Sequence, residues 1–326
     1  MYNNEIHFSL WLDFLEREFI QNEFQKVISQ YKITGATSNP AIFKEAILNS
    51  SAYQAQLHLL QNKNPKEKYE ALAIKDIQMA ADVLKPLYDK GDDGFVSIEV
   101  DPRLAHDAQG TVQEAKRLFQ EIGKENVMIK IPVTPAGCEA IEELVADGIH
   151  INATLIFSPY QARECLDAME RGSKKNQNAH KVLSIFVSRF DRKLDPILQS
   201  KGLPIGKVGI MNAAKIYNMI KKRDLPYTRA LFASTGVKGG AYPAHYYISS
   251  LVAPNSVNTA PLSTIEAFVK DGDERPKLPI SEEEIDHFFA MLKAHEIDMK
   301  QVYHDLLHEG LKAFEEAFEA ILQELD

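Results

Sequence analysis

The chain has 326 residues, of which 45% are hydrophobic and 25% are charged, and its formal net charge is −9. This composition is typical of folded globular proteins, and the acidic balance disfavours nucleic acid and anionic membranes as partners. Two cysteines are too few for a disulfide framework, the first residues do not resemble a signal peptide, and no apolar run approaches the roughly 18 residues that span a bilayer. We therefore expect a cytoplasmic protein that binds neither nucleic acid nor membrane.

Short apolar runs alternate with helical patterns along the chain. The eight candidate strands are residues 8–12, 33–37, 95–100, 127–131, 149–157, 182–187, 230–234 and 246–251. Segments between them, such as 111–122 and 158–171, have apolar residues at spacings of three and four, which is typical of amphipathic helices. No glycine-rich phosphate loop follows an early strand, which favours an α/β fold of the (β/α)8 TIM-barrel type over a doubly wound sheet. We expect one domain over residues 1–326.

Two regions predict helices beyond the barrel repeat. Residues 43–94 form a connection too long to lack secondary structure inside a folded domain. Near the end of the chain, a serine at 281 and a glutamate at 284 match a capping box, and a later stripe of apolar residues has helical spacing. The stripe consists of Leu307, Leu311, Phe314, Phe318 and Leu322. We therefore expect extra helices after the second strand and at the C-terminus.

Lys130 lies in the middle of the apolar run 127–132, with no carboxylate within four residues along the strand. Burial of an unpaired ammonium is unfavourable, so a lysine in such a place tends to lose its proton and become a nucleophile. Desolvated lysines attack carbonyl carbons and form Schiff bases, which makes Lys130 a candidate nucleophile. Taken alone, the pattern also fits a lysine whose ammonium reaches solvent or an ion pair.

The alternation of side chains along the strands indicates a site around this lysine. If the aliphatic residues of each strand face the helices, Leu155 and Phe157 among them, a mainly polar set faces the barrel lumen. This set contains Trp11, Asp13, Ser97, Glu99, Asp101, Lys130, Asn152, Thr154, Ser184, Phe186 and Ser188. An unpaired buried polar group costs about 1–3 kcal/mol, so these groups must bond one another, water or a ligand. Barrel active sites lie at the carboxyl ends of the strands, and we expect the site there.

Five segments resemble the signature segments of the transaldolase family and occur in the family's order. They are TSNP at 37–40, VSIEVDPR at 96–103, IKIP at 129–132, INATLIFS at 151–158 and ASTGVK at 233–238. The last is similar to the longer bacterial and plant subgroup. The resemblance implies a (β/α)8 barrel that acts in the pentose phosphate pathway through a Schiff base, without metal or cofactor. It also implies sugar phosphate substrates and a monomer or homodimer.

The resemblance assigns the chemical steps to four residues. Lys130 matches the Schiff-base lysine of the fourth strand. Asp13 matches the acid/base group that deprotonates a donor hydroxyl so that the bond between the third and fourth carbons breaks. Glu99 and Thr154 match the pair that holds a water molecule, which relays protons during imine formation. Such proton transfer typically increases the reaction rate by a factor of about 10²–10⁴.

The resemblance also assigns residues that bind substrate. Asn39, Asn152 and Ser184 match groups that bind the donor, and Phe186, in the place of a tyrosine, favours transfer over simple aldol cleavage. Arg189 and Ser234 match phosphate-binding residues. Many relatives have an arginine two residues after this serine, whereas here Gly236 occupies that position and Lys238 is the candidate to supply the missing charge.

Other interpretations remain beside this one. His304 and His308 have the spacing of two zinc ligands, but the middle acid of the metalloprotease motif is absent, and we interpret them as a solvated helix face. A pyridoxal phosphate lysine is a weak match to a residue in mid-strand among small polar groups. Two alternatives stay open: a fructose-6-phosphate aldolase-type lyase that releases free dihydroxyacetone, and a catalytically inactive barrel that only binds sugar phosphates.

Overall fold

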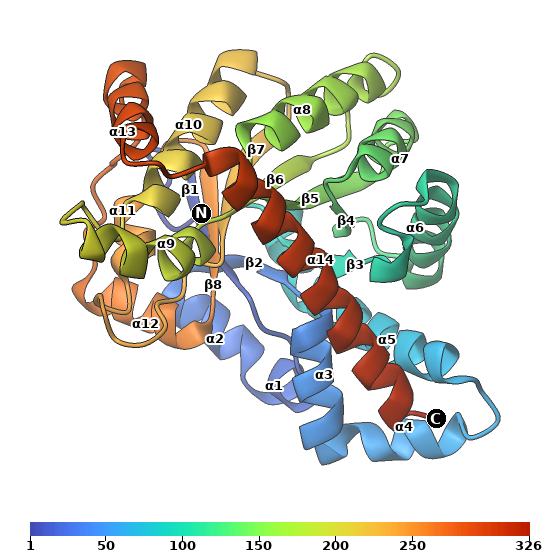
Figure 1. The fold of residues 1–326 in the computed structure, drawn as a ribbon. Helices are drawn as coiled ribbons and strands as arrows, with labels where there is room; N and C mark the ends of the chain where they lie inside the picture. Colours follow the sequence, from blue (N-terminus) through green and yellow to red (C-terminus); the bar gives the residue numbers. More distant parts are fainter.

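The computed structural model describes residues 1–326, and its centre is a closed barrel of eight strands. The strands follow one another in chain order and every neighbouring pair is parallel, which confirms the predicted (β/α)8 architecture (Figure 1). They are β1 (Phe8–Leu12), β2 (Ile33–Thr37), β3 (Phe95–Glu99), β4 (Val127–Pro132), β5 (His150–Ile156), β6 (Lys181–Phe186), β7 (Thr228–Ala233) and β8 (Ser256–Ala260).

Helices surround the barrel and bury its outer face. They are α1 (Arg17–Asn22), α2 (Phe24–Tyr31), α5 (Pro65–Tyr88), α6 (Ala108–Ile122), α7 (Pro135–Ala146), α8 (Pro159–Ser173), α9 (Ser188–Ser200), α10 (Val208–Arg223), α11 (Tyr246–Ser250) and α12 (Leu262–Asp271). The start of α8 shows why a helix forms there: Ser158 and Gln161 make a reciprocal capping box around Pro159. The sequence predicts that α8 ends before Gly172, but it continues to Ser173. A Cβ on Gly172 would lie 2.5 Å from the Glu142 carbonyl oxygen, so this glycine lets α8 pack closely on α7.

The extra helices occur where the sequence predicts them. Between β2 and β3 lie α3 (Pro40–Asn49) and α4 (Gln54–Leu59) in addition to α5, and the chain ends with α13 (Glu282–Ala294) and α14 (Met299–Glu324). Figure 1 shows α14 running across the front of the barrel. Its apolar face is buried through Leu311, Phe314 and Phe318. None of the helices combines the length and apolar character that crossing a bilayer requires.

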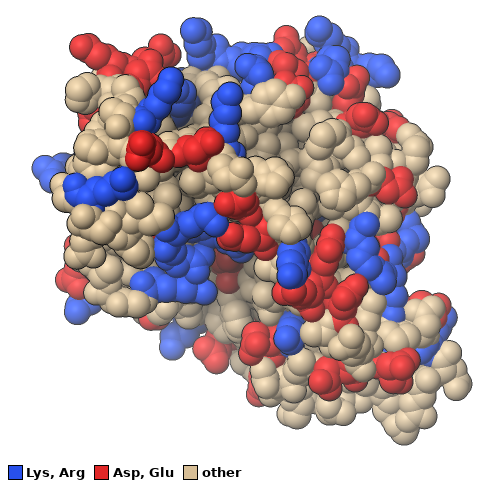
Figure 2. Space-filling model, viewed as in Figure 1, with Lys and Arg blue, Asp and Glu red and all other residues tan.

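Charged residues help to hold α14 against α9. Lys193 Nζ lies 2.7 Å from Glu309 Oε1 and 3.6 Å from Asp305 Oδ2. Figure 2 views the same face, and on it the Lys and Arg side chains over α9 meet acidic side chains where α14 passes. Such partly exposed ion pairs contribute little stability each, so the buried stripe of α14 is the main reason for its position.

The eighth strand is not where the apolar pattern places it. Residues 246–251 are predicted as a strand, but Tyr246–Ser250 forms the short helix α11, and β8 is Ser256–Ala260. Three of the five residues of β8 have hydroxyl or amide side chains, which gives the segment no strand-like hydrophobic pattern. What makes it a strand is backbone pairing, since all five residues pair with β1 and three with β7.

Three predicted side-chain orientations are also wrong. In β5 the alternation is interrupted between Ala153 and Ile156, and Leu155 has φ of +56°. This irregularity reverses the pattern, so Ile156 joins the core beneath the helices, while Leu155 and Phe157 belong to the second core cluster, which joins lumen side chains to α14. Asp101 does not face the lumen either, because β3 ends at Glu99 and the Asp101 carboxylate pairs with Lys66 at 2.9 Å and Arg103 at 2.6 Å.

The lumen is filled at its N-terminal end by large apolar side chains. Trp11, Phe95, Met128 and Val182 are buried there and belong to one core cluster. Gly35 is required beside Trp11, since a Cβ at this position would lie 2.7 Å from the indole ring. This packed layer leaves the polar residues to the C-terminal half of the barrel.

Candidate active site

A cavity of about 180 Å³ opens at the C-terminal mouth of the barrel. Eight of the residues that the sequence singles out line it, and the structure brings them together from six strands or strand ends and one helix. The eight are Asp13, Asn39, Lys130, Thr154, Ser184, Phe186, Arg189 and Ser234; the other lining residues are Thr37, Ala41, Ala233, Thr259 and Phe314. Glu99 and Asn152 do not line it, but both are paired neighbours of Lys130 in the strand register.

Lys130 is 5% exposed and lies at the centre of this arrangement. Its Nζ donates a hydrogen bond to the Ser38 carbonyl oxygen at 3.0 Å and lies 3.4 Å from Glu99 Oε2. The register explains the second contact, because Glu99 and Lys130 are paired neighbours on β3 and β4. The Phe314 ring of α14 covers the other side, with its centroid 5.5 Å from Nζ. The amine is therefore shielded from bulk water but open to the cavity.

Glu99 has an unusual environment for a carboxylate. Burial raises its pKa to about 7, Lys130 opposes this rise, and Asp13 adds to it. Neither carboxyl oxygen has a hydrogen-bond partner, and the buried Oγ1 of Thr154 also has none. Orphaned polar atoms at such depth indicate that they bind water or substrate. A group with a pKa of about 7 can both give and take a proton near neutral pH.

Asp13 follows the last residue of β1 and is held by its neighbours on both sides. Its backbone N–H donates to the Ala260 carbonyl oxygen at 2.9 Å, and its Oδ1 accepts from Thr37 Oγ1 at 2.7 Å. The Thr37 hydroxyl is in turn 2.7 Å from Thr259 Oγ1. Burial raises the pKa of Asp13, while Lys130 and the Thr37 hydrogen bond oppose the rise. One carboxylate oxygen thus stays available to the cavity.

A chain of hydrogen bonds fixes the amide of Asn152. Its Nδ2 donates to Ser97 Oγ at 3.0 Å, and its Oδ1 accepts from Ser184 Oγ at 2.6 Å. Asn39 is the N-cap of α3, where its side chain accepts from the Ile42 N–H at 3.1 Å. Both amides are therefore oriented before any ligand binds, which lowers the entropic cost of binding.

One end of the cavity is positively charged. Arg189, in the first turn of α9, has its guanidinium 5.2 Å from the Phe186 ring centroid, and burial together with nearby Arg192 lowers its pKa. The guanidinium has no hydrogen-bond or ion-pair partner among the protein's side chains, so it is free to bind an anion. Ser234, with φ of +55°, places its Oγ 3.0 Å from Ser188 Oγ. Lys238 is exposed on the loop after β7 and does not line the cavity.

Sequence reasoning missed three residues that shape the cavity. Thr37 and Thr259 orient Asp13, and Phe314 covers Lys130. Thr259 lies on the strand that the sequence misplaces, and the distance of Phe314 along the chain conceals its position. For Thr37 a signal existed, since it ends a predicted strand two residues before the asparagine at 39.

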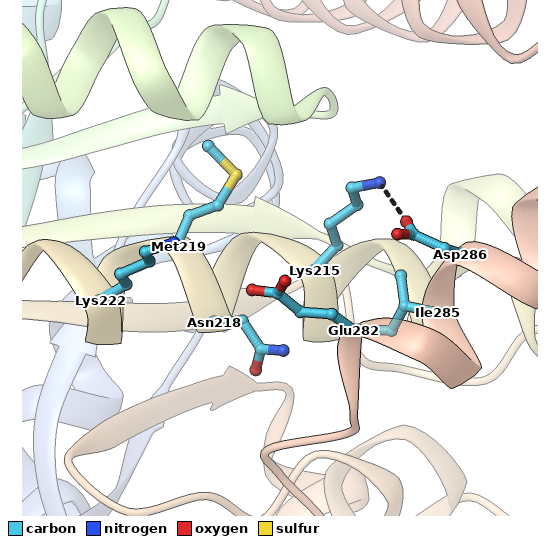
Figure 3. Close-up of a pocket in the computed structure, with 7 residues that line it drawn as sticks. All are labelled: Lys215, Asn218, Met219, Lys222, Glu282, Ile285 and Asp286. Carbon is cyan, nitrogen blue, oxygen red and sulfur yellow. Dashed lines mark hydrogen bonds and ion pairs between the residues drawn. The ribbon is translucent and has the colours of Figure 1, made fainter.

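A hollow of about 240 Å³ on the outer surface is a weaker candidate (Figure 3). It lies between α10 and α13, where Lys215 Nζ and Asp286 Oδ1 are 3.2 Å apart. Both side chains are more than a third exposed, at 38% and 70%, and their charges neutralise each other. No buried nucleophile lines it. The structure also contains no group of three or more His, Cys, Asp or Glu side chains arranged to hold a metal ion.

Comparison with known proteins agrees with the site's geometry. The family model described as transaldolase/fructose-6-phosphate aldolase matches residues 10–325. A protein named transaldolase from Campylobacter jejuni (strain RM1221) is 48% identical, with 98% of this chain and 99% of that protein covered. One of the same name from Helicobacter pylori (strain HPAG1) is 44% identical, with 97% and 98% covered. The chain therefore belongs to the transaldolase/fructose-6-phosphate aldolase family.

Proposed function

We propose that this protein is a transaldolase: it transfers a dihydroxyacetone unit from sedoheptulose 7-phosphate or fructose 6-phosphate to an aldose phosphate, either glyceraldehyde 3-phosphate or erythrose 4-phosphate. The observation that carries the proposal is the buried amine of Lys130, which faces a polar cavity and has Glu99 beside it at 3.4 Å. Family membership supports both the reaction class and sugar phosphates as substrates.

The reaction begins when the Lys130 amine attacks the ketone carbon of the donor. The resulting carbinolamine loses water to give an iminium ion, which requires protons to move between nitrogen and oxygen. Glu99 and Thr154 suit this task, because their unpartnered oxygens can hold a water between lysine and substrate. The iminium then draws electrons from the neighbouring carbon–carbon bond.

Bond cleavage needs a base at the hydroxyl of the fourth carbon. Asp13 takes that proton, the bond between the third and fourth carbons breaks, and the aldose leaves with its phosphate. The electron pair remains on the three-carbon unit as an enamine bound to Lys130. In the second half the enamine carbon attacks the aldehyde of the acceptor, and Asp13 returns the proton. Burial raises the pKa of Asp13, which makes its carboxylate a stronger base for removal of the hydroxyl proton.

Binding residues fit the two ends of such a substrate. Asn39, Asn152 and Ser184 suit the hydroxyl groups of the donor, and Arg189 with Ser234 suits the phosphate. Lys238 stays a predicted phosphate ligand that would have to approach from its exposed loop. A cytosolic location and a monomeric or dimeric state also stay predictions.

The second candidate is a lyase that protonates the enamine and releases free dihydroxyacetone. Transfer is favoured because Phe186 brings no hydroxyl into the cavity and no tyrosine lines it. Fewer proton donors beside the enamine mean slower protonation by water. Measuring aldose-dependent transfer against release of dihydroxyacetone, with fructose 6-phosphate as donor, separates the two reactions.

Borohydride reduction in the presence of fructose 6-phosphate, followed by peptide mass spectrometry, tests the mechanism. We expect a reduced three-carbon adduct on the peptide that contains Lys130, and none in Lys130→Met. Lys181→Met is a matched control, because Lys181 is also a buried strand lysine, 1% exposed, whose Nζ donates to Ser173 Oγ at 3.1 Å. An adduct on any other lysine would disprove the assignment. No adduct with retained sugar phosphate binding would favour the inactive barrel.

A further inference from the structure

Two threonine hydroxyls lie beside Asp13, one from each of the strands that pair with β1. Thr37 ends β2 on one side, and Thr259 lies in β8 on the other. Both residues are buried, at 2% and 4% exposed, and both line the mouth cavity together with Asp13. Barrel closure thus joins two hydroxyls that are 222 residues apart along the chain.

The hydrogen bonds among these three side chains have a defined direction while Asp13 is ionised. A carboxylate only accepts hydrogen bonds, so the 2.7 Å contact between Thr37 Oγ1 and Asp13 Oδ1 uses the Thr37 hydrogen. A hydroxyl has one hydrogen, and the 2.7 Å contact between the two threonine oxygens therefore uses the hydrogen of Thr259. Donation thus runs from Thr259 to Thr37 and from Thr37 to Asp13.

The opposite direction of donation is less favourable. It would need a proton on Asp13 Oδ1 that is donated to Thr37, whose own hydrogen would then be donated to Thr259. Because Thr259 Oγ1 makes no other hydrogen bond within the protein, its hydrogen would be left without an acceptor. Oδ1 therefore stays an acceptor whether Asp13 is charged or neutral, and a proton that Asp13 takes up resides on Oδ2.

The hydrogen bond from Thr37 also favours the charged form of the Asp13 carboxyl. Burial raises the pKa of Asp13, whereas Lys130 and the hydrogen bond from Thr37 lower it. The other charged groups near this carboxyl are Glu99, which has the same charge sign, and Arg189 at the phosphate end of the cavity. Donation from Thr259 makes the Thr37 hydroxyl a stronger donor, because hydrogen bonds in series polarise one another.

We propose that Thr37 and Thr259 are positioning residues for proton transfer by Asp13: they keep Oδ1 as an acceptor, so that Oδ2 is the oxygen that takes the substrate proton and returns it. The proton then stays on one oxygen between cleavage of the donor and attack on the acceptor aldehyde. This inference rests on the proposed transfer reaction and adds two residues to those that the reaction needs.

A single turnover with fructose 6-phosphate and no acceptor separates Schiff-base formation from bond cleavage. Borohydride is added at successive times, and peptide mass spectrometry then distinguishes a six-carbon adduct on Lys130, formed before cleavage, from the three-carbon adduct formed after it. In Thr37→Val, which removes the hydroxyl and keeps the side-chain shape, the six-carbon adduct should form as in the wild type. Its conversion to the three-carbon adduct should slow by about tenfold or more, because the carboxylate loses a hydrogen bond.

The pH dependence of this conversion tests the role of the hydrogen bond directly. Conversion begins after the Schiff base has formed, so it is separate from the step assigned to Glu99. It needs Asp13 in its charged form, and loss of the Thr37 hydrogen bond disfavours that form. The pH below which conversion slows should therefore be higher in Thr37→Val than in the wild type, by about one pH unit.

Three further variants distinguish a positioning role from a merely structural one. Thr37→Ser retains the hydroxyl, so its conversion should stay within about threefold of the wild-type rate, with the same pH dependence. Thr259→Val retains the donor to Asp13 and should slow conversion less, by about twofold to fivefold. Thr34→Val is the matched control, since Thr34 lies at the other end of β2, is 3% exposed and donates to the buried Asp93 Oδ2 at 3.0 Å. This control should leave conversion unchanged.

Several outcomes would overturn the proposal while Lys130 still forms its adduct. They are wild-type conversion or an unshifted pH dependence in Thr37→Val, a failure of Thr37→Ser to restore conversion, and an equal loss in Thr34→Val. Wild-type conversion in Thr259→Val would overturn the role of Thr259. If the wild type itself forms no adduct on Lys130, the proposed function fails, and this inference fails with it.

Discussion

Replacement of Glu99 by glutamine should stabilise the protein in a way that depends on pH. The carboxyl group is buried, its two oxygens have no hydrogen-bond partner, and its pKa in the folded chain is about 7 against an ordinary 4.5. This pKa already includes the attraction of Lys130, so the folded state disfavours the charged form even with its ion pair. At about 1.4 kcal/mol for each pH unit between the two values, the penalty is about 3 kcal/mol once the group is ionised.

The direction of the pH dependence follows from which state, folded or unfolded, keeps the Glu99 proton. Between pH 4.5 and 7 the unfolded chain has released this proton while the folded chain retains it, so this group's contribution to stability falls as pH rises. Below pH 4.5 both states are protonated and there is no penalty; above pH 7 the penalty is constant. Glutamine does not titrate. The free energy of unfolding of Glu99→Gln should therefore exceed that of the wild type by a margin that grows by about 2–3 kcal/mol from pH 5 to pH 8.

Urea unfolding of both proteins at pH 5, 6.5 and 8 measures this difference. Glu283→Gln, at an exposed position in the first turn of α13, is the control and should show little dependence on pH relative to the wild type. The same Glu99→Gln protein should lose about 10²-fold or more in turnover, because the proton relay is broken. A stability difference that stays constant over this pH range, or shrinks as pH rises, would refute the burial argument.

Three further substitutions test other parts of the site and fold. Arg189→Ala should raise the KM for fructose 6-phosphate at least tenfold, because a charge-assisted contact to the phosphate is lost. Arg192→Ala, at an exposed position of the same helix, is the control and should change the KM less than threefold. Equal effects of the two substitutions would show that Arg189 does not bind the phosphate. Phe314→Leu should lower the yield of the borohydride adduct by about twofold to tenfold, because the aromatic ring 5.5 Å from Lys130 Nζ stabilises the positively charged iminium formed there. An unchanged yield at saturating donor would contradict this expectation. Gly35→Ala should destabilise by about 2 kcal/mol or more in urea unfolding, because its methyl group would lie 2.7 Å from the Trp11 ring; neutral stability would show that the indole can shift.

The hydrophobic pattern along the sequence was sufficient to predict most strands of the barrel. Seven strands occur where short apolar runs predict them, because strands buried on both faces must be rich in aliphatic residues whatever their partners are. The alternation of side chains along the strands also predicted that Lys130, Asp13, Thr154 and Ser184 face the lumen, and all four line the cavity. Burying a charged amine in mid-strand is unfavourable enough that the sequence alone marked it as a functional group.

The tertiary structure decided what depends on partners remote in the chain. β8 is a strand because β1 and β7 supply hydrogen bonds on both sides, although its own side chains do not indicate it. The break in β5 turned Leu155 inward, and the pairing of β3 with β4 set Glu99 beside Lys130. α14 brought Phe314 over the amine from the far end of the chain. The sequence by itself determined which side chains must be buried, whereas barrel closure and helix packing determined which of them meet, since those contacts join residues distant along the chain.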